Sequence, residues 1–255
     1  MPAAYDRSVK VLATYNIKGG VGKTASAVNL AYLAARGGAR TLVWDLDPQG
    51  AASYYFRVGP RDKGSGARAL VRGKHDLDGL IRSTDHEYLD LLPANISYRN
   101  LDLALDETKK PTRRISRLVE PLAVDYQYLF LDCPPSLSLV SENVFTAADA
   151  LLIPLIPTTL SLLAFEQVRE FLAESKWHKL QLLPFFTMVD RRRRMHRDLV
   201  EDGGASPSVL NSWIAAAADV ERMGPHQAPV GVFAPRCRAA VGYEELWEEI
   251  KVALK

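Results

Sequence analysis

The sequence predicts an α/β fold: a doubly wound, mostly parallel sheet with helices on both faces. Short apolar runs alternate along the chain with longer runs of helical spacing, which is typical of repeated βα units. The apolar runs show little polar alternation, as expected of parallel strands covered on both faces. A glycine-rich segment, residues 16–24, joins the first strand-like run to the first helical run. We expect one domain over residues 1–255, with ligands at the carboxyl ends of the strands.

Composition limits the functional classes. The chain has 255 residues, a hydrophobic content of 47% and a net charge of +2, so any basic surface must be local. The cysteines, Cys133 and Cys237, form no CxxC pair, which fits a reducing compartment and disfavours an Fe–S or zinc site. We find no apolar signal region at the N-terminus and no run near the roughly 20 residues of a membrane span. We therefore expect a cytoplasmic protein without a membrane partner.

The elements follow in order along the chain. Strands are predicted at residues 9–15, 40–45, 88–93, 128–132, 150–155 and 180–188. Helices are predicted at residues 25–35, 113–122, 161–174, 194–202, 209–216 and 244–255. The pair Gly37-Gly38 is a plausible stop for the first helix. Residues 46–53 are expected to form a loop, and residues 57–82 a peripheral segment with short helical pieces at 67–70 and 77–81.

The segment from Asn16 to Thr24, with the sequence NIKGGVGKT, lies between a strand and a helix, as a phosphate-binding loop does. Its glycines let backbone N–H groups turn toward an anion, and the helix directs its positive end at the same anion. Lys23 would reach the β and γ phosphates, and the Thr24 hydroxyl would bind Mg²⁺. The expected nucleotide contacts are Lys18, Gly19, Gly20, Val21, Gly22, Lys23, Thr24 and Ala25.

A second motif, DLDPQG, follows the next strand and carries Asp45 and Asp47. Two carboxylates two residues apart lie on the same side of an extended chain. Beside a Mg-nucleotide, one could bind the metal or its waters while the other orients the attacking water. A polar turn after a strand is the alternative interpretation of such a motif in isolation.

A third motif, DCPPS, begins at Asp132 after the apolar run LFL. An acidic residue at such a strand end usually holds Mg²⁺ through a water. The two prolines keep the chain from continuing directly into a helix. Cys133 is interpreted as a small space-filling residue, because no histidine is near it in the sequence.

Taken together, KGGVGKT, DLDPQG and DCPP resemble the motifs of the ParA/MinD family of deviant Walker A ATPases, on a P-loop NTPase fold. The resemblance implies ATP and Mg²⁺ as cofactors, with Thr24, Asp47 and Asp132 at the metal. It also implies that Asp47 activates the water with support from Asp45, and that Lys18 reaches across a homodimer to the partner's nucleotide.

The resemblance extends over about residues 9–255. The segment TMVDR resembles one that lies near the adenine pocket in the family, so Met188 is expected there. Two departures remove no phosphate or metal ligand: Ala25 replaces a frequent second Thr, and Ala51-Ala52-Ser53 replaces a common Asn-Ala-Thr. There is no room before Val9 for a helix-turn-helix domain, so operator-specific autoregulation is not expected.

An arginine-rich segment is the expected DNA surface, because arginines neutralise phosphates without reading sequence. The candidate contacts are Arg191, Arg192, Arg193, Arg194, Arg197 and Arg222. A solvated loop is the alternative, because Asp190, Asp198, Glu201 and Asp202 lie among them. The resemblance implies an ATP-bound dimer on non-specific double-stranded DNA and a nucleoid-associated location. A ParB-like or cargo adaptor protein would stimulate hydrolysis to position a plasmid, a chromosome or an assembly such as a carboxysome.

Two rival functions stay open. A MinD-like membrane ATPase would use its C-terminal helix, but residues 244–255 carry four glutamates, which anionic lipid would repel, so core packing is expected. An ATP-dependent biosynthetic ligase on the same fold would need its own acid and base cluster, and none is evident. The histidines are scattered and expected at the surface: His75, His86, His178, His196 and His226.

Overall fold

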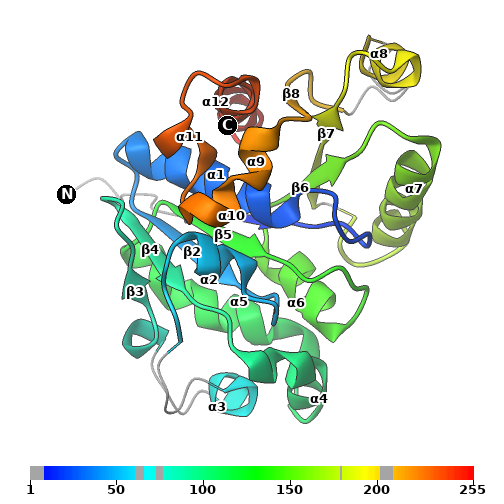
Figure 1. Cartoon of the computed structure of the whole chain (residues 1–255). Helices are drawn as coiled ribbons and strands as arrows, with labels where there is room; N and C mark the ends of the chain where they lie inside the picture. The colour runs from blue at the N-terminus through cyan, green and yellow to red at the C-terminus, as the bar shows by residue number, and fades with distance from the viewer. Residues whose placement is uncertain (1–8, 61–65, 73–76, 179, 202–208) are drawn as a thin grey trace, which may run out of the picture.

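The computed structural model describes residues 9–60, 66–72, 77–178, 180–201 and 209–255, which build one eight-stranded sheet (Figure 1). The strand order is β3-β4-β2-β5-β1-β6-β7-β8. All neighbouring strands are parallel except β3 and β4, which are antiparallel. The predicted fold class, a doubly wound and mostly parallel sheet, is confirmed.

The bounds of the elements are as follows. The strands are β1 Lys10–Thr14, β2 Thr41–Asp45, β3 Arg82–Ser83, β4 Leu89–Leu92, β5 Tyr128–Asp132, β6 Ala150–Leu155, β7 Gln181–Val189 and β8 Trp213–Ala215. The α-helices are α1 Lys23–Arg36, α2 Ala51–Tyr55, α3 Ala67–Arg72, α4 Leu101–Asp106, α5 Arg114–Val119, α6 Leu139–Ala147, α7 Thr159–Ala173, α8 Arg194–Glu201, α9 Ala218–Glu221, α10 Met223–His226, α11 Val230–Phe233 and α12 Arg238–Ala253. Single 3₁₀ turns lie at η1 Leu77–Gly79, η2 Ile96–Asn100, η3 Pro111–Arg113 and η4 Glu120–Val124.

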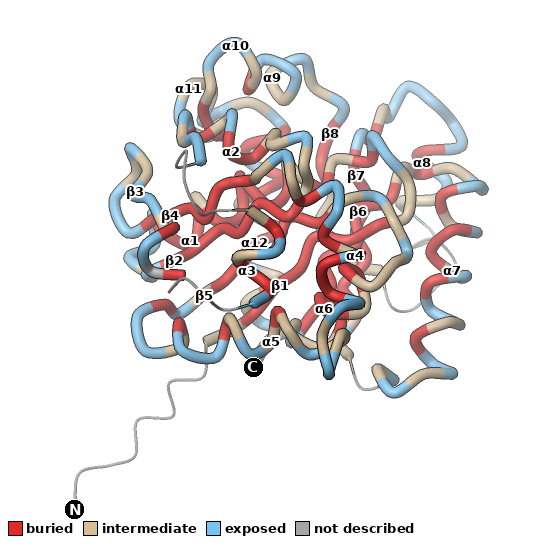
Figure 2. Tube along the Cα trace, turned by 90° about the horizontal axis from the view of Figure 1, so that it is seen from below, coloured by how far each residue is buried: buried red, intermediate tan, exposed pale blue. Residues whose placement is uncertain are grey.

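Helices cover both faces of the sheet, and successive side chains along each central strand point alternately into two apolar layers. In β1, Val11 and Ala13 point into the layer formed with α3 to α7, whereas Leu12 points into the layer formed with α1, α2 and α12. The same alternation holds in β5, where Phe130 faces the second layer. Because both faces are buried, the central strands are apolar throughout, and Figure 2 shows them as a continuous buried centre.

The strand order determines where the functional segments meet. β1 is central and pairs with β5 on one side and β6 on the other, while β2 pairs with the far edge of β5. The last residues of these strands are in register: Thr14 lies beside Asp132, and Asp132 lies beside Asp45. The glycine-rich loop and both aspartates therefore leave the same edge of the sheet, as predicted.

Some predicted elements were wrong in type or length. Residues 209–216 were predicted as a helix, but Trp213–Ala215 is the edge strand β8, because its backbone pairs with β7. The C-terminal helix begins at Arg238 rather than at 244, since Cys237 accepts a capping hydrogen bond from the Ala240 N–H. The predicted loop at 46–53 ends in the short helix α2.

Other helices were missed or are broken. The predicted helix at 113–122 is split into η3, α5 and η4, and Pro121 stands at the start of η4. Helix α6 was not predicted, although a capping box between Ser138 and Ser141 marks its start. The predicted helix at 194–202 corresponds to α8, but residue 202 lies outside the described residues, as do residues 61–65 and 73–76 of the peripheral segment.

The C-terminal helix α12 packs into the core, as expected. Its apolar side chains Tyr243, Leu246, Trp247 and Ile250 are buried against the sheet and α1. The apolar face that a membrane helix would need is therefore already used within the fold. In the part of the chain that the structure describes, no helix is long and apolar enough to cross a membrane.

The contact between α12 and β8 gives a test of the fold. A Cβ added at Gly242 would lie 2.6 Å from the backbone carbonyl oxygen of Trp213. We expect Gly242→Ala to lower the free energy of unfolding by about 1–3 kcal/mol, because the backbone must shift to relieve the overlap. Gly224→Ala is the control: its added Cβ meets nothing within 4 Å, so its stability should stay within about 1 kcal/mol of the parent. Equal stability of the two variants in urea unfolding would contradict this packing.

Candidate active site

The glycine-rich loop between β1 and α1 forms an open cradle. Gly20 and Gly22 have φ of 71° and 91°, a conformation that side chains other than glycine rarely adopt. A Cβ added at Gly19 or Gly20 would meet nothing within 4 Å, so the space in front of the loop is free. At the start of α1, Gly22 provides no side-chain cap, and the first turn has no acidic residue. The free N–H groups of this turn suit an anion.

The two lysines of the loop point in different directions. Lys23 is buried, and its ammonium donates a 2.8 Å hydrogen bond to the carbonyl of Lys18, inside the loop. Burial lowers the pKa of Lys23, while the nearby Asp132, Cys133 and Asp47 act in the opposite direction. The Lys18 ammonium instead donates to the carbonyl of Leu160 at 2.7 Å, in the first turn of α7. The Lys23 ammonium is thus held within the loop, whereas the Lys18 ammonium is bonded outside it.

Neighbouring strands hold the loop in place. The buried Asn16 donates to the Pro154 carbonyl of β6 at 2.9 Å and accepts from the Lys18 N–H at 2.9 Å. The Thr187 hydroxyl of β7 donates to the Val21 carbonyl at 2.9 Å. Our sequence analysis missed both residues, although an amide side chain at the first position of a glycine loop is a signal that could have been used.

Asp132 is fully buried at the end of β5, beside the loop. Its Oδ1 accepts from the Thr14 hydroxyl at 3.2 Å, but its Oδ2 has no hydrogen-bond partner among the described residues. Burial and the charge of Asp45 raise the pKa of Asp132, and the hydroxyls of Thr24 and Thr14 lower it. An unpartnered buried carboxylate oxygen beside Thr24 fits a metal ion with its water shell. Among the described residues no group of three or more His, Cys, Asp or Glu could hold a metal, so phosphate oxygens would have to complete its shell.

Asp45 and Asp47 lie together but have different surroundings. Asp45 is fully buried, and both of its oxygens accept hydrogen bonds from the protein: Oδ1 from the Asp47 N–H at 3.3 Å, and Oδ2 from Ser53. Burial raises the pKa of Asp45. Asp47 is half-buried and accepts from the Gln49 N–H at 2.9 Å. The chain does not stay extended past β2, so the two carboxylates are not equivalent.

Met188 lies next to the glycine-rich loop. The pairing of β7 with β8 is irregular between Phe186 and Val189, and Met188 there has a φ of 53°. An added Cβ at Gly22 would lie 4.0 Å from the Met188 methyl carbon. The irregularity turns this exposed side chain toward the loop, as bulges near functional sites often do.

The arginine-rich segment continues directly from β7 into α8. Arg191, Arg192 and Arg194 form exposed ion pairs with Glu201, Asp190 and Asp198. Arg193 and Arg197 have no acidic partner among the described residues; Arg197 donates to the Arg191 carbonyl. Asp202, also named as a neighbouring acid, lies outside the described residues.

Arg222 is not joined to this segment. It lies between α9 and α10 and pairs with Asp219 at 3.2 Å. Figure 1 shows this α9–α10 segment, drawn in orange, away from α8.

The prediction that the histidines are at the surface was wrong for His196. It is buried, and its Nδ1 accepts the Asp190 N–H at 3.1 Å, which fixes the start of the arginine-rich segment. His75 lies outside the described residues.

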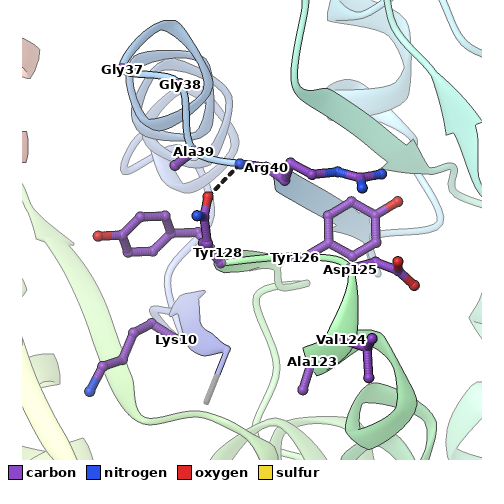
Figure 3. Close-up of a pocket in the computed structure, with 11 residues that line it drawn as sticks. Lys10, Gly37, Gly38, Ala39, Arg40, Ala123, Val124, Asp125, Tyr126 and Tyr128 are labelled. Atoms are coloured by element: carbon purple, nitrogen blue, oxygen red, sulfur yellow. Dashed lines mark hydrogen bonds between the residues drawn. The ribbon is translucent and has the colours of Figure 1, made fainter. Parts of the chain in front are cut away.

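A separate pocket of about 600 Å³ opens at the opposite, amino-terminal edge of the sheet (Figure 3). Lys10, Arg40, Tyr126 and Tyr128 line it together with the turn after α1. Figure 3 shows that the charged ends of Lys10 and Arg40 point away from each other. The Tyr126 hydroxyl donates a 2.8 Å hydrogen bond to the Asp90 carboxylate. These side chains do not converge on a common point, so the pocket is not part of the candidate site.

Comparison with known proteins gave matches over nearly the whole chain. A family described as "AAA domain" matches residues 9–182. The sporulation initiation inhibitor protein Soj of Bacillus subtilis is 30% identical over 247 residues, covering 94% of this chain and 98% of Soj. The chromosome partitioning protein ParA of Caulobacter vibrioides is 28% identical over 253 residues, covering 95% and 94%. The structure of cobyrinic acid a,c-diamide synthase from Mycobacterium smegmatis, with a bound ATP analog and magnesium, has a TM-score of 0.82 at 26% identity, covering 97% of this chain and 96% of that chain.

The buried carboxylate of Asp132 gives a pH-dependent prediction. Because its pKa is raised on folding, the folded state holds the proton more tightly than the unfolded state, and stability falls as pH rises above the unfolded pKa. Asp132→Asn removes this penalty. We expect the variant to exceed the parent by at least about 1 kcal/mol in free energy of unfolding at pH 7, and the difference to shrink below about pH 4. The exposed Asp125→Asn is the control. A lower stability of Asp132→Asn at pH 7 would contradict the assigned burial penalty.

Proposed function

The chain belongs to the ParA/MinD family of P-loop ATPases, and from this premise we propose that it is a DNA-associated ATPase that positions a cargo. Its activity is ATP hydrolysis, and its cofactors are ATP and Mg²⁺. Proposed beyond this are a single domain over residues 1–255, an ATP-dependent homodimer, binding to non-specific duplex DNA, and a ParB-like or cargo adaptor partner. We further propose a cytoplasmic, nucleoid-associated location.

The phosphate contacts of the proposal follow from the open loop. Residues 18–25 would surround the phosphates, with Lys23 leaving the Lys18 carbonyl to reach the β and γ phosphates. That exchange is favourable because a phosphate offers a charged acceptor in place of a neutral carbonyl. Thr24, Asp132 and Asp47 would hold Mg²⁺, which when bound neutralises charge on the phosphates. Met188, which lies beside Gly22, is proposed to contact adenine.

Asp47 is proposed to orient the water that attacks the γ phosphate. Asp47 is half-buried, its charge raises the pKa of Lys23, and its backbone N–H is held by Asp45, so the carboxylate has a defined position near the loop. Phosphoryl transfer passes through a loose transition state, so positioning and electrostatic stabilisation account for most of the catalysis. Asp45 supports Asp47 without contacting the reacting atoms.

The observation that carries the dimer proposal is the outward direction of Lys18. Its ammonium is bonded to α7 and not to the loop that carries it, so it contributes nothing to its own cradle. The side chains of Leu160 and Leu163, in the same turn of α7, are 66% and 54% exposed. A second copy facing this side would cover those leucines and accept Lys18 near its nucleotide.

The arginine-rich segment supplies the proposed DNA surface. Its first arginine, Arg191, follows the end of β7 and lies three residues after Met188, so the proposed nucleotide site and the proposed DNA surface share one strand. Exposed ion pairs are each worth only about 0–1 kcal/mol, so Arg191, Arg192 and Arg194 can exchange their acidic partners for phosphates. Arg193 and Arg197 have no such partner to give up among the described residues.

A second candidate function is ATP-dependent amide formation, favoured by the 26% identity to the diamide synthase. The two functions differ in what stimulates ATP hydrolysis. A ligase of this kind would hydrolyse ATP only with its acid substrate and amide donor, independently of DNA. Stimulation by cobyrinic acid-like substrates, with no binding to DNA, would favour this candidate.

Replacing Lys18 tests the dimer. We expect Lys18→Ala to keep ATP binding within about tenfold, because the loop retains its glycines, Lys23 and Thr24, but to lose stimulated hydrolysis by at least about 100-fold. The exposed Lys176→Ala, on the segment after α7, is the matched control and should behave as the parent. Turnover is measured by phosphate release with DNA and the adaptor present. Full stimulated turnover in Lys18→Ala would exclude the cross-dimer role.

DNA binding gives a second test. We expect Asp47→Ala with ATP to bind duplex DNA of any sequence, more weakly as salt rises, and the ADP form to bind much less. Adding Arg193→Ala and Arg197→Ala should reduce the slope of log K against log salt by about 1 for each arginine. Arg169→Ala, an exposed arginine on α7 that pairs with Glu166, is the control. Fluorescence anisotropy showing equal binding with ATP and ADP would contradict the proposed switch.

A further inference from the structure

Ser53, in helix α2, lies close behind the segment that carries Asp47. It is 93% buried by its surroundings, with only 7% of its surface exposed, which is unusual for a serine in so short a helix. Its hydroxyl is placed between the end of β2 and the chain that follows β4. Nothing in the motifs of the sequence assigned it a role.

Three hydrogen bonds join the hydroxyl and the N–H of Ser53 to Asp45 and Ala94. Its N–H and its hydroxyl both donate to Oδ2 of Asp45, at 2.8 and 2.7 Å. Its hydroxyl oxygen accepts from the Ala94 N–H at 2.8 Å. The single hydroxyl therefore uses its donor and an acceptor position at once, and it links β2, α2 and the segment after β4.

The other end of the same segment is held by the same carboxylate. Oδ1 of Asp45 accepts from the Asp47 N–H at 3.3 Å. Between the two anchor points the chain is turned back on itself, because the Gly50 N–H donates to the Asp47 carbonyl at 2.9 Å and Gly50 has a φ of 68°. The backbone of residues 47–53 thus forms a short arch, and both of its ends are hydrogen-bonded to the Asp45 carboxylate.

We propose that Ser53 is a positioning residue for ATP hydrolysis, which acts by fixing the Asp45 carboxylate and through it the position of Asp47. The proposal rests on the role of Asp47 proposed above. Without the Ser53 hydroxyl, Asp45 loses one of its two bonds to α2 and the Ala94 N–H loses its acceptor. The arch can then shift relative to the glycine-rich loop, which Ser53 does not contact through any described hydrogen bond.

This arrangement separates binding from turnover. The loop residues that hold the phosphates are fixed by Asn16 and Thr187 from the other side of the sheet edge. Loosening the arch should therefore leave nucleotide affinity unchanged while the attacking water loses its alignment. A misplacement of about 1 Å can reduce a catalysed rate by about 100-fold.

The test compares Ser53→Ala with Ser53→Thr in the full-length chain. We expect Ser53→Ala to lower kcat by about 10- to 100-fold. Its Kd for ATP with Mg²⁺, measured by isothermal titration, and its KM should stay within about threefold of the parent. Ser53→Thr keeps the hydroxyl and should restore kcat to within about threefold. A general loss of structure would instead change affinity and turnover together and would not be rescued by threonine.

Three outcomes would overturn the inference: a parental kcat in Ser53→Ala, an equal loss of kcat and ATP affinity, or failure of threonine to restore kcat. If Ser53→Ala is too unstable to purify, Ser53→Cys keeps the size with a weaker donor, and an intermediate kcat with unchanged Kd is expected. A parental kcat in Ser53→Cys would then overturn it. Asp47→Ala, assayed alongside, separates the two proposals: if it keeps turnover, the role of Asp47 fails, whatever Ser53 does.

Discussion

Two carboxylates buried side by side impose the main constraint on this structure. Asp45 and Asp132 end adjacent strands in register, both fully buried at the carboxyl edge of the sheet. Burial raises the pKa of both carboxyls, and the charge of Asp45 raises the pKa of Asp132 further, so the pair needs compensating donors and cations close by. Ser53 and the Asp47 N–H supply the donors for Asp45, while the hydroxyls of Thr14 and Thr24 lower the pKa of Asp132. The ammonium of Lys23 lies close enough to Asp132 for the charge of that carboxylate to raise its pKa, so it is a compensating cation at this edge of the sheet.

The two carboxylates differ in their hydrogen-bond partners, and this difference suits them to different roles in the proposed site. Both carboxylate oxygens of Asp45 accept hydrogen bonds from the protein, and these bonds hold the chain that follows Asp45 in place. Asp132 keeps one oxygen without a partner among the described residues, which leaves it available to a hydrated metal ion. A structure that satisfied both groups internally would be more stable and would lose the proposed metal position. The penalty at Asp132 is therefore what we expect where stability is given up at the proposed functional site.

The sequence predicted the central strands, the loop and the acidic motifs because each is a local pattern. Short apolar runs identify buried strands, and the spacing of Lys18, Lys23 and Thr24 depends on one loop only. The arch could not be predicted, since Ser53 and Ala94 are brought together by the pairing of β2 with β4. For the same reason residues 209–216 were assigned a helix: their alanines favour it locally, but pairing with β7 decides the structure. The burial of His196 likewise depends on a turn contact with Asp190.

In the proposed function, each chain carries half of a nucleotide site, and ATP brings the two halves together. Light scattering of Asp47→Ala after size exclusion, with saturating ATP and Mg²⁺ and then with ADP, measures this directly. The account predicts twice the single-chain mass of 28.3 kDa with ATP, and the single-chain mass with ADP. A single-chain mass at saturating ATP and Mg²⁺, in a variant shown to have bound the nucleotide, would contradict it.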